Sequence, residues 1–447
     1  MHSTCHNRHI FSLVGCCLIF LLMACNSNMP PTTVPKGTPR TPGITPPISR
    51  GITPISTATT TVAMPSTQIS CPPEGTARGM VTAPLALGSH QNIIYTLNQG
   101  TYDAPTHAKL IRYDVQTGRK AELLNVNKAH IYEAQVSADG QWVLFVTTTG
   151  SVGRQSKLQM LRLDGQGLQT LYCAPDFGIQ QILWSTDQHL LVFYNVVNEQ
   201  GVVYLLNMTG GALQAEFSPP LGTGIVLRTW LDATHVYLTD TSVDTIHARI
   251  YLLDINKGPH QHFGNLLTVL LQNYGDFDSS DDGSQLFVSH GGCPQGVCSG
   301  PSSITKQSIA GSSRQTIYDS QVYDVIAVRT IDHNSLLFII GNTSTIFGTD
   351  VDRSHNGLWK INVDGSGMTR LISITAQQYC FLNYNDQEPW ANVSRDGSMY
   401  VLQVNGFEEG IVEKDSLLVG SVDGGKPKVF ATIADGSQLV MAGWTVM

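Results

Sequence analysis

The chain has 447 residues, of which 13% are charged, and its formal net charge at pH 7 is −8. No run of Lys and Arg stands out in this acidic sequence, which argues against a nucleic-acid-binding surface. The hydrophobic content of 42% suits a globular protein, and the 42 glycines suit a fold with many tight turns. Long stretches with helical periodicity are hard to find, so we expect an all-β protein.

The first element in chain order is a targeting segment. Residues 10–23 are apolar, too short to span a bilayer as a stable helix but long enough for the core of a signal peptide. The segment ends in Leu22-Met23-Ala24-Cys25, which resembles the lipobox of bacterial lipoproteins. The resemblance implies removal of residues 1–24 and a diacylglycerol on the sulfur of Cys25. We therefore expect a lipid-anchored protein on the extracytoplasmic side of a cell membrane; an ordinary secreted protein and an uncleaved anchor are the alternatives.

Residues 25–70 follow as a tether. They are rich in Pro, Thr and Ser and lack aromatic side chains, so they cannot bury enough surface to fold. Pro-rich chain is stiff and rises roughly 3.1 Å per residue, so this segment could hold a domain on the order of 100 Å from the membrane. A spacer is the simplest interpretation, and a wall-binding or glycosylated stalk is the alternative.

Five cysteines lie beyond the tether, in a compartment that permits disulfides. Two of them flank the short loop CPQGVC, and we predict a bridge between Cys293 and Cys298. This pair alone is a poor zinc site because zinc needs more ligands at suitable spacing. Connectivity does not follow from sequence for the other three, and a bond between Cys71 and Cys380, with Cys173 left over, is no more than a guess.

A hairpin motif recurs along the remaining chain. Residues 136–146 read VSADGQWVLFV, in which an Asp-Gly turn separates two apolar, β-rich runs. Later segments align on the same turn with steps of 48, 45, 50, 50 and 64 residues. A period near 50 is typical of a propeller or another repeat array. The turn positions are Asp139, Asp187, Asp232, Asp282, Asp332 and Asp396.

A second strand–turn–strand signature follows each hairpin, so every repeat holds four strands, a to d, joined up-and-down. The first copy, residues 90–125, lacks strand a. Residues 439–447 have the pattern of a strand a with no strand b after it, and Trp444 stands where Trp184 stands in its repeat. We therefore predict that residues 71–447 form a seven-bladed β-propeller of four-stranded antiparallel blades, closed by the C-terminal strand.

The combination of W-S-x-D turns with D-G-S and D-G-G turns resembles the TolB-type, WD40-like Asp-rich β-propeller family, over about residues 90–447. The proline of the W-S-P-D-G turn of that family is missing in every copy. The resemblance implies a propeller that scaffolds protein complexes outside the cytoplasm. Similar blades in relatives of prolyl oligopeptidase gate a hydrolase domain.

Longer connections gather on one predicted face of the ring, which carries the b–c and d–a loops. Four of them, in blades 5 to 7, span residues 290–301, 342–357, 375–390 and 405–415. Long loops on a rigid scaffold often carry binding residues, so we predict an aromatic patch there for a sugar or a protein partner. Packing of the loops on themselves is the alternative. The patch comprises Tyr379, Phe381, Tyr384, Trp390 and Phe407.

Alternating oxygen donors in residues 350–356 hint at a calcium site, and the carboxylate-rich residues 276–282 are a weaker candidate because they overlie a strand-a turn. His355 occupies the place of the required glycine and Ile361 the place of the final Glu, so the site is weak and we expect no metal. Its candidate ligands are Asp350, Asp352, Ser354 and Asn356.

No catalytic motif stands out: the sequence has no G-x-S-x-G elbow, no H-E-x-x-H and no P-loop. We therefore expect a monomeric module without cofactors or chemistry of its own, which binds a protein or a cell-envelope glycan. The alternative is a propeller hydrolase or lyase with paired carboxylates in the central funnel. A structural or sensor subunit is a third hypothesis.

Overall fold

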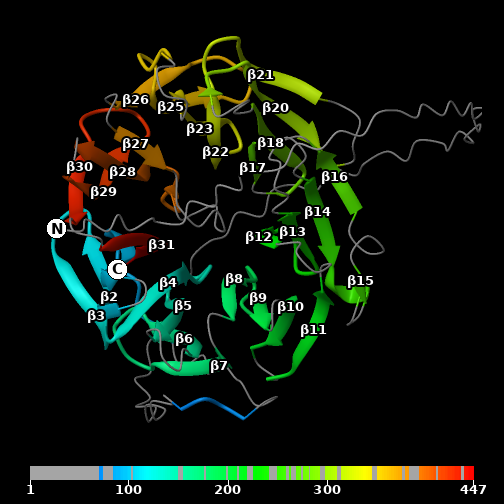
Figure 1. Ribbon diagram of the computed structural model, residues 1–447, viewed down its shortest axis with the longest axis vertical. Helices are drawn as coiled ribbons and strands as arrows, with labels where there is room; N and C mark the ends of the chain where they lie inside the picture. Colours follow the sequence, from blue (N-terminus) through cyan, green and yellow to red (C-terminus); the bar gives the residue numbers. More distant parts are fainter. Residues whose placement is uncertain are drawn as a thin grey trace, which may run out of the picture. The chain divides into compact units, whose positions relative to one another are not determined.

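Four-stranded antiparallel sheets arranged around a central axis make up the folded part of the protein (Figure 1). The computed structural model describes residues 70–73, 84–101, 104–149, 155–175, 178–197, 200–208, 211–218, 225–240, 249–257, 261–262, 268–272, 275–280, 282–291, 297–309, 314–344, 350–374, 378–381, 392–408, 411–433 and 437–447. The fold is a seven-bladed β-propeller, as predicted, and the strands of each blade run from a, nearest the axis, to d, at the outer edge.

The first three blades follow the predicted strand order. Blade 1 contains β31 (Gln438–Val446), β1 (Gln91–Thr101), β2 (Ala104–Asp114) and β3 (Lys120–Asn127). Blade 2 contains β4 (Ala129–Val136), β5 (Trp142–Thr149), β6 (Gln155–Arg162) and β7 (Gln169–Pro175). Blade 3 contains β8 (Ile179–Trp184), β9 (Leu190–Val197), β10 (Gln200–Asn207) and β11 (Leu213–Ser218), to which β15 (Gln261–His262) adds a short parallel fifth strand.

The remaining four blades repeat this order. Blade 4 contains β12 (Ile225–Trp230), β13 (His235–Asp240), β14 (Arg249–Asp254) and β16 (Thr268–Gln272), with a 3₁₀ turn, η2 (Ile255–Lys257), after β14. Blade 5 contains β17 (Asp276–Ser279), β18 (Gln285–His290), β20 (Ser302–Ser308) and β21 (Arg314–Ser320). Blade 6 contains β22 (Val325–Asp332), β23 (Ser335–Ile340), β25 (Gly357–Asn362) and β26 (Thr369–Ser373). Blade 7 contains β27 (Gln378–Phe381), β28 (Met399–Glu408), β29 (Ile411–Ser421) and β30 (Lys428–Ile433).

Two faces of the ring follow from this order. The a–b and c–d turns lie at one end of every blade, which we name the turn face, and the b–c and d–a connections lie at the other, the loop face. On the loop face, β19 (Val297–Cys298) pairs with β24 (Thr343–Ser344) and thereby links the b–c connections of blades 5 and 6.

The ring closes through the pairing of β31 with β1. The two strands are antiparallel, with Ile94 opposite Gly443 and Ile93 opposite Trp444, and backbone bonds between His90 and Met447 extend the ladder. The predicted closing strand is therefore confirmed, in the predicted place. Trp444 is fully buried in this strand, among apolar side chains of blades 1 and 7.

The recurrent turn motif is explained by side-chain hydrogen bonds at the a–b turns. In blade 2, the Ser137 hydroxyl donates to Asp139 Oδ1 (2.5 Å) and accepts from the backbone N–H of Trp142 (3.0 Å). Gly140 follows with φ of +71°, a conformation that a glycine adopts without strain. The same Ser-x-Asp pair occurs in blades 3, 5 and 7, at Ser185, Ser280 and Ser394.

Apolar strand residues fill the layers between blades, as the alternating pattern predicts. One layer joins blades 2 and 3 around Trp142, Leu144 and Phe193. The corresponding residues of strand b are buried in each of blades 2 to 7: Trp142, Leu144, Val192, Val236, Leu286, Leu337 and Val401.

Polar side chains on the innermost strands add a second link between neighbouring blades. Gln135 in blade 2 accepts a hydrogen bond from the backbone N–H of Trp184 in blade 3 (2.9 Å), and Gln181 in blade 3 accepts one from Leu227 in blade 4 (2.6 Å). A shift of one blade along the axis would break these bonds and leave the amide oxygens without a donor, which is destabilising. The bonds therefore fix the relative height of adjacent blades along the axis.

The structure corrects the guessed cysteine pairing. Cys71 forms its disulfide with Cys173, with Cα atoms 5.8 Å apart, and not with Cys380. Cys173 lies near the end of β7, the outer strand of blade 2, where the Gln155 side chain also reaches the Cys71 sulfur. The bond thus fastens residues 70–73 to the outer edge of blade 2 at the loop face. Sequence could not reveal this because partners in a disulfide need only be close in space. The predicted Cys293–Cys298 bridge is not tested, because Cys293 and the Cys298 side chain lie outside the described residues.

Two predicted loops of blade 7 are partly strand. Within 375–390, residues 378–381 form β27, and the isolated bridge between Val393 and Tyr400 resumes the same inner strand after the insertion. Within 405–415, β28 and β29 continue as a hairpin as far as the pairing of Glu408 with Ile411.

Replacing the buried tryptophan of the closing strand tests the closure. Trp444→Ala should lower the free energy of unfolding by about 3–5 kcal/mol, because it removes a buried aromatic side chain from the inner strand of blade 1. Val429→Ala, at a position of β30 that is 52% exposed, is the matched control and should change it by less than about 1 kcal/mol. Urea denaturation, monitored by far-UV circular dichroism, gives the free energy of unfolding of both variants. Equal losses of stability in the two variants would contradict the role of the closing strand.

Peptide mapping under non-reducing conditions should recover a cross-linked peptide that contains Cys71 and Cys173. Because the bond closes a segment with a sequence separation of 102, its loss in Cys71→Ser/Cys173→Ser should cost about 4–5 kcal/mol in the chain-entropy account. Thermal unfolding of this variant and of the wild type gives the difference. A Cys71–Cys380 peptide in the map, or an unchanged midpoint, would refute the assignment.

Candidate functional site

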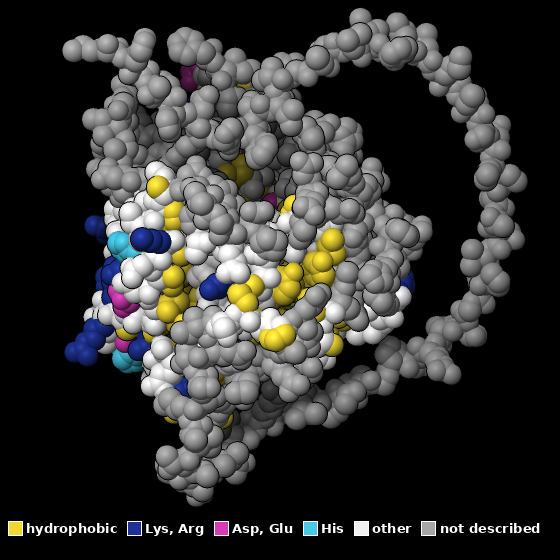
Figure 2. Space-filling model, turned by 60° about the horizontal axis from the view of Figure 1, so that its bottom comes forward, with side chains coloured by type: hydrophobic (Ala, Val, Ile, Leu, Met, Phe, Trp, Pro, Cys, Tyr) yellow, Lys and Arg dark blue, Asp and Glu magenta, His cyan; other side chains and the backbone are white. Residues whose placement is uncertain are grey.

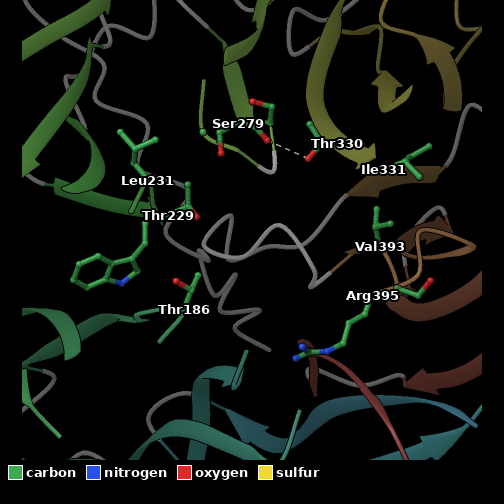
Figure 3. A pocket seen from close by; sticks show the side chains of 12 residues that line it. Thr186, Thr229, Leu231, Ser279, Thr330, Ile331, Val393 and Arg395 are labelled. Atoms are coloured by element: carbon green, nitrogen blue, oxygen red, sulfur yellow. Dashed lines mark hydrogen bonds between the residues drawn. The ribbon is translucent and has the colours of Figure 1, made fainter. Parts of the chain in front are cut away.

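A cavity of about 380 Å³ opens on the turn face, where the inner strands of blades 3 to 7 converge (Figure 3). Its wall is half polar in character, with hydroxyl-bearing side chains beside apolar ones. The lining residues come from the ends of the inner strands and from the turns that follow them. They are Thr186, Thr229, Trp230, Leu231, Ser279, Ser280, Gly283, Thr330, Ile331, Val393, Ser394 and Arg395.

The repeat itself builds this pocket. Nearly all of the lining residues occupy the three positions before the turn aspartate of their repeat, for example Ser279 and Ser280 before Asp282. Because each inner strand ends at the same height, these positions from five blades surround one space. Figure 3 shows Thr330 and Ser279 together at the edge of the cavity, where the Thr330 hydroxyl donates to the Ser279 carbonyl oxygen (3.3 Å).

Arg395 forms one side of the pocket and also spans the closure of the ring. Its guanidinium donates to the carbonyl oxygen of Trp444 in β31 (3.0 Å) and to those of Ala138 and Ser137 in the a–b turn of blade 2. Blade 1 has no a–b turn of its own, since its strands a and b come from distant parts of the sequence. Arg395 therefore connects blade 7 to blade 2 across the closing strand.

A buried ion cluster lies on the inner strands of blades 4 to 6, next to the pocket wall. Arg228 Nη2 is 2.6 Å from Asp276 Oδ1, and Arg329 Nη1 is 2.5 Å from Asp276 Oδ2. The three side chains are at most 8% exposed. Burial by itself would raise the pKa of Asp276, but the charges of Arg329 and Arg228 outweigh it and hold this pKa below its ordinary value. Asp276 is therefore an ionised carboxylate that neutralises two buried cations.

Asp278, two residues further along β17, fixes a pocket residue. Its Oδ2 accepts hydrogen bonds from the backbone N–H (2.8 Å) and the hydroxyl (2.9 Å) of Thr330. Burial raises the pKa of this carboxyl despite these bonds and the nearby charge of Arg329. The two carboxylates of β17 thus hold blade 6 against blade 5, immediately below Ser279 and Thr330.

This arrangement is suited to binding. Within the described residues, the pocket lining contains no Asp or Glu side chain. Hydrolysis by paired carboxylates needs two acidic groups facing the substrate, whereas Asp276 and Asp278 are engaged with arginines and with Thr330. The hydroxyls and exposed backbone groups of the wall can instead form hydrogen bonds, and the apolar side chains can exclude water from a bound group.

Three positions of the predicted aromatic patch lie on the inner two strands of blade 7, β27 and β28. Tyr379 and Phe381 lie on β27, opposite Asn405 and Gln403, and Phe407 lies further along the neighbouring strand β28. The side chains of these three patch positions, and the whole of Tyr384 and Trp390, lie outside the described residues. The patch therefore stays a prediction.

The predicted calcium ligands lie in a loop of blade 6 whose oxygens take part in internal hydrogen bonds. Asp352 accepts from the Tyr323 hydroxyl (3.0 Å) and from the Ser354 backbone N–H (2.8 Å), and Asn356 Oδ1 accepts from the Asn342 backbone N–H (2.9 Å). Asp350 is exposed. Across the described residues, no group of three or more His, Cys, Asp or Glu side chains is arranged to hold a metal ion.

Sequence reasoning did not identify the pocket, although a signal was present. The aligned repeats carry hydroxyl-bearing or small residues in the positions before the turn aspartate, such as Thr229, Ser279 and Thr330. These residues lie at the ends of the inner strands, whereas the predicted binding patch belongs to the longer segments of blade 7.

Comparison with known proteins supports the fold. No family model and no curated protein matches the sequence. Similar solved structures include the β-propeller domain of the trilobed protease from Pyrococcus furiosus, whose topology is described as an open velcro. The two sequences are 11% identical, the match covers 78% of this chain and 94% of that one, and the TM-score is 0.50. An acylaminoacyl peptidase matches with 9% identity over 80% of this chain and 53% of its own, and a TM-score of 0.50.

TolB from Acinetobacter baumannii is also among the similar structures, with 14% identity over 63% of each chain and a TM-score of 0.40. This chain thus spans less than two thirds of that TolB chain and about half of the peptidase chain. TolB proteins and other β-propellers are among the structural neighbours, as the turn motifs predicted. What this protein shares with them is the propeller fold, and here the ring is closed by β31.

Two neighbouring aspartates provide a matched test of the ion cluster. Asp276→Asn should cost about 3–5 kcal/mol of stability at neutral pH, because it leaves Arg228 and Arg329 buried without a counter-charge. Asp278→Asn should cost no more than about 1–2 kcal/mol, since a carboxamide oxygen can still accept from Thr330.

The pH dependence of the first variant follows from the lowered pKa of Asp276. Its stabilisation is present above the ordinary carboxyl pKa of about 4 and is lost as pH falls through the lower pKa of the folded state. The difference in the free energy of unfolding between wild type and Asp276→Asn should therefore become smaller below about pH 4. Urea titrations at a series of pH values measure this difference. A difference that widens in acid would exclude an ionised Asp276.

Proposed function

We propose that this protein is a membrane-anchored, extracytoplasmic binding module that holds a segment of a partner protein in the turn-face pocket. The observation that carries the proposal is the convergence of five blades on one cavity that has hydrogen-bonding and apolar walls. A cell-envelope glycan is the alternative occupant, and the experiment below distinguishes the two.

The pocket wall favours a peptide. Leu231, Ile331 and Val393 offer contacts to an aliphatic side chain, and the hydroxyls of Thr186 and Ser279 stand beside them. A peptide presents apolar side chains together with backbone donors and acceptors, which matches a wall of this mixed kind. The rigid, closed ring adds to affinity because little order is lost when the partner binds.

Extracytoplasmic placement has support from the disulfide and from the N-terminal sequence. Disulfides persist in oxidising compartments, and the Cys71–Cys173 bond lies at the point where the proposed tether reaches the propeller. The apolar segment and Ala24-Cys25 precede that tether. No helix in the described part of the chain is long and apolar enough to cross a bilayer.

Thr186→Trp tests the pocket. Thr186 is an exposed turn residue on the pocket rim, so an indole there should fill the mouth without disturbing the core. Gln166→Trp, at an exposed c–d turn of blade 2 outside the pocket, is the matched control. Proteins cross-linked to the full chain in cell envelopes, and glycans retained on a glycan array, are compared for the two variants.

We expect Thr186→Trp to lose at least one cross-linked protein by roughly tenfold or more, which is the loss expected when the centre of an interface is blocked. Gln166→Trp should keep it. Loss of glycan retention with unchanged protein cross-links would assign the pocket to a glycan. Identical profiles for wild type, variant and control would refute a role of the pocket in binding.

The anchor is tested separately by Cys25→Ser. The wild-type chain should partition into a detergent phase and incorporate a labelled fatty acid, because acyl chains on Cys25 attach it stably to a membrane. Cys25→Ser should incorporate no labelled fatty acid, because the acceptor sulfur is absent. Cys16→Ser, within the removed segment, is the control and should behave as wild type.

A further inference from the structure

Basic side chains gather where the outer parts of blades 1 and 7 meet. Arg119 and Lys120 come from the c–d turn and β3 of blade 1, and Lys426 and Lys428 come from the c–d turn and β30 of blade 7. A Cβ atom at Gly118 would lie 3.4 Å from Lys428 Nζ, so the Lys428 side chain of blade 7 reaches the c–d turn of blade 1. We name Arg119, Lys120, Lys426 and Lys428 the basic patch.

Aromatic rings beneath the patch fix the position of two of its cations. Lys428 Nζ lies 5.5 Å from the centre of the Tyr113 ring, and Lys120 Nζ lies 6.0 Å from that of Tyr95. Phe430 packs against both rings, at 4.7 Å from Tyr113 and 5.6 Å from Tyr95. Cations held over rings in this way lose little additional order when they meet an anion.

The nearby carboxylates already contact other side chains. Asp114 contacts His90 (2.9 Å), Glu122 contacts Lys109 (2.7 Å) and Asp423 contacts Lys360 (3.6 Å). The patch residues, all exposed, make no ion pair with any residue in the described part of the chain. The patch is thus positively charged, whereas the whole chain has a formal net charge of −8.

The surface view agrees with this distribution. Figure 2 shows Lys and Arg side chains along the left side of the molecule, with His, Asp and Glu side chains among them, where Figure 1 places β2, β3 and β30. The remainder of the described surface in that view carries few basic side chains. The patch arises from two blades at opposite ends of the sequence, which is why no basic run marks it in the chain.

We propose that the basic patch docks the propeller onto anionic phospholipid headgroups of the membrane that holds its tether. This inference rests on the proposed lipid anchor at Cys25. Each Lys or Arg close to an anionic bilayer adds to the attraction, which fades within a Debye length of about 8–10 Å.

A tether makes such a weak contact effective. Four cations alone give a low affinity, but a domain linked to the same membrane meets it at a high effective concentration. The tether of residues 25–70 would then set how far the undocked propeller reaches, and the patch would set how much of the time it lies against the bilayer.

Vesicle binding tests the proposal on residues 25–447 carrying Cys25→Ser, so that neither the apolar segment of residues 10–23 nor an acyl chain contributes. Co-sedimentation at low salt is compared for phosphatidylcholine vesicles with and without phosphatidylglycerol. We expect binding only with phosphatidylglycerol, and a loss of binding as the salt concentration rises.

Arg119→Glu/Lys426→Glu reverses two exposed charges that contact no ring and should weaken vesicle binding by roughly tenfold or more. Lys257→Glu/Arg314→Glu makes the same charge change on blades 4 and 5 and should bind as the parent does. Lys120→Gln/Lys428→Gln is a second patch variant, which should weaken binding in the same direction. Thermal unfolding confirms that each variant is folded.

Three outcomes would overturn the proposal: equal binding to neutral vesicles, equal binding by the patch and control variants, or binding to soluble polyphosphate without binding to vesicles. The last result would assign the patch to a free polyanion. None of these outcomes involves the pocket or the acyl chain, so the Thr186→Trp and fatty-acid labelling experiments stand independently.

Discussion

The antiparallel pairing of β31 with β1 is the constraint on which the rest of the structure depends. Every other blade takes its four strands from consecutive sequence, so only in blade 1 does a non-covalent ladder hold the ring together. The buried Trp444 and the guanidinium of Arg395 both act at this place. If the ladder opened, blades 1 and 7 would expose the apolar layer between them and two unpaired strand edges.

Closure also determines which groups can meet at the axis. With strand a innermost in all seven blades, the strand ends and a–b turns converge on one face, and the hydroxyls of that face surround the pocket. The polar links between inner strands hold them at matching heights, as Asp278 does for Thr330. The buried pair of arginines around Asp276 therefore serves the geometry of the pocket from outside its lining.

Much of the fold follows from local chemistry that a sequence displays directly. The turn at Asp139 needs only residues a few positions apart, and the role of Trp444 follows from its place in a repeat. The Cys71–Cys173 bond, the cluster around Asp276 and the basic patch join residues from different blades. Their partners are set by the closed ring, so no single repeat contains the information to predict them.

The positions of the disulfide and the pocket on opposite faces bear on how a tethered propeller can bind. Cys173 lies near the loop-face end of the outer strand of blade 2, so the chain that precedes Cys71 starts from that edge. The pocket opens at the axis on the turn face. The disulfide therefore fastens residues 70–73 on the face away from the pocket, so this part of the N-terminal chain takes no part in the pocket wall.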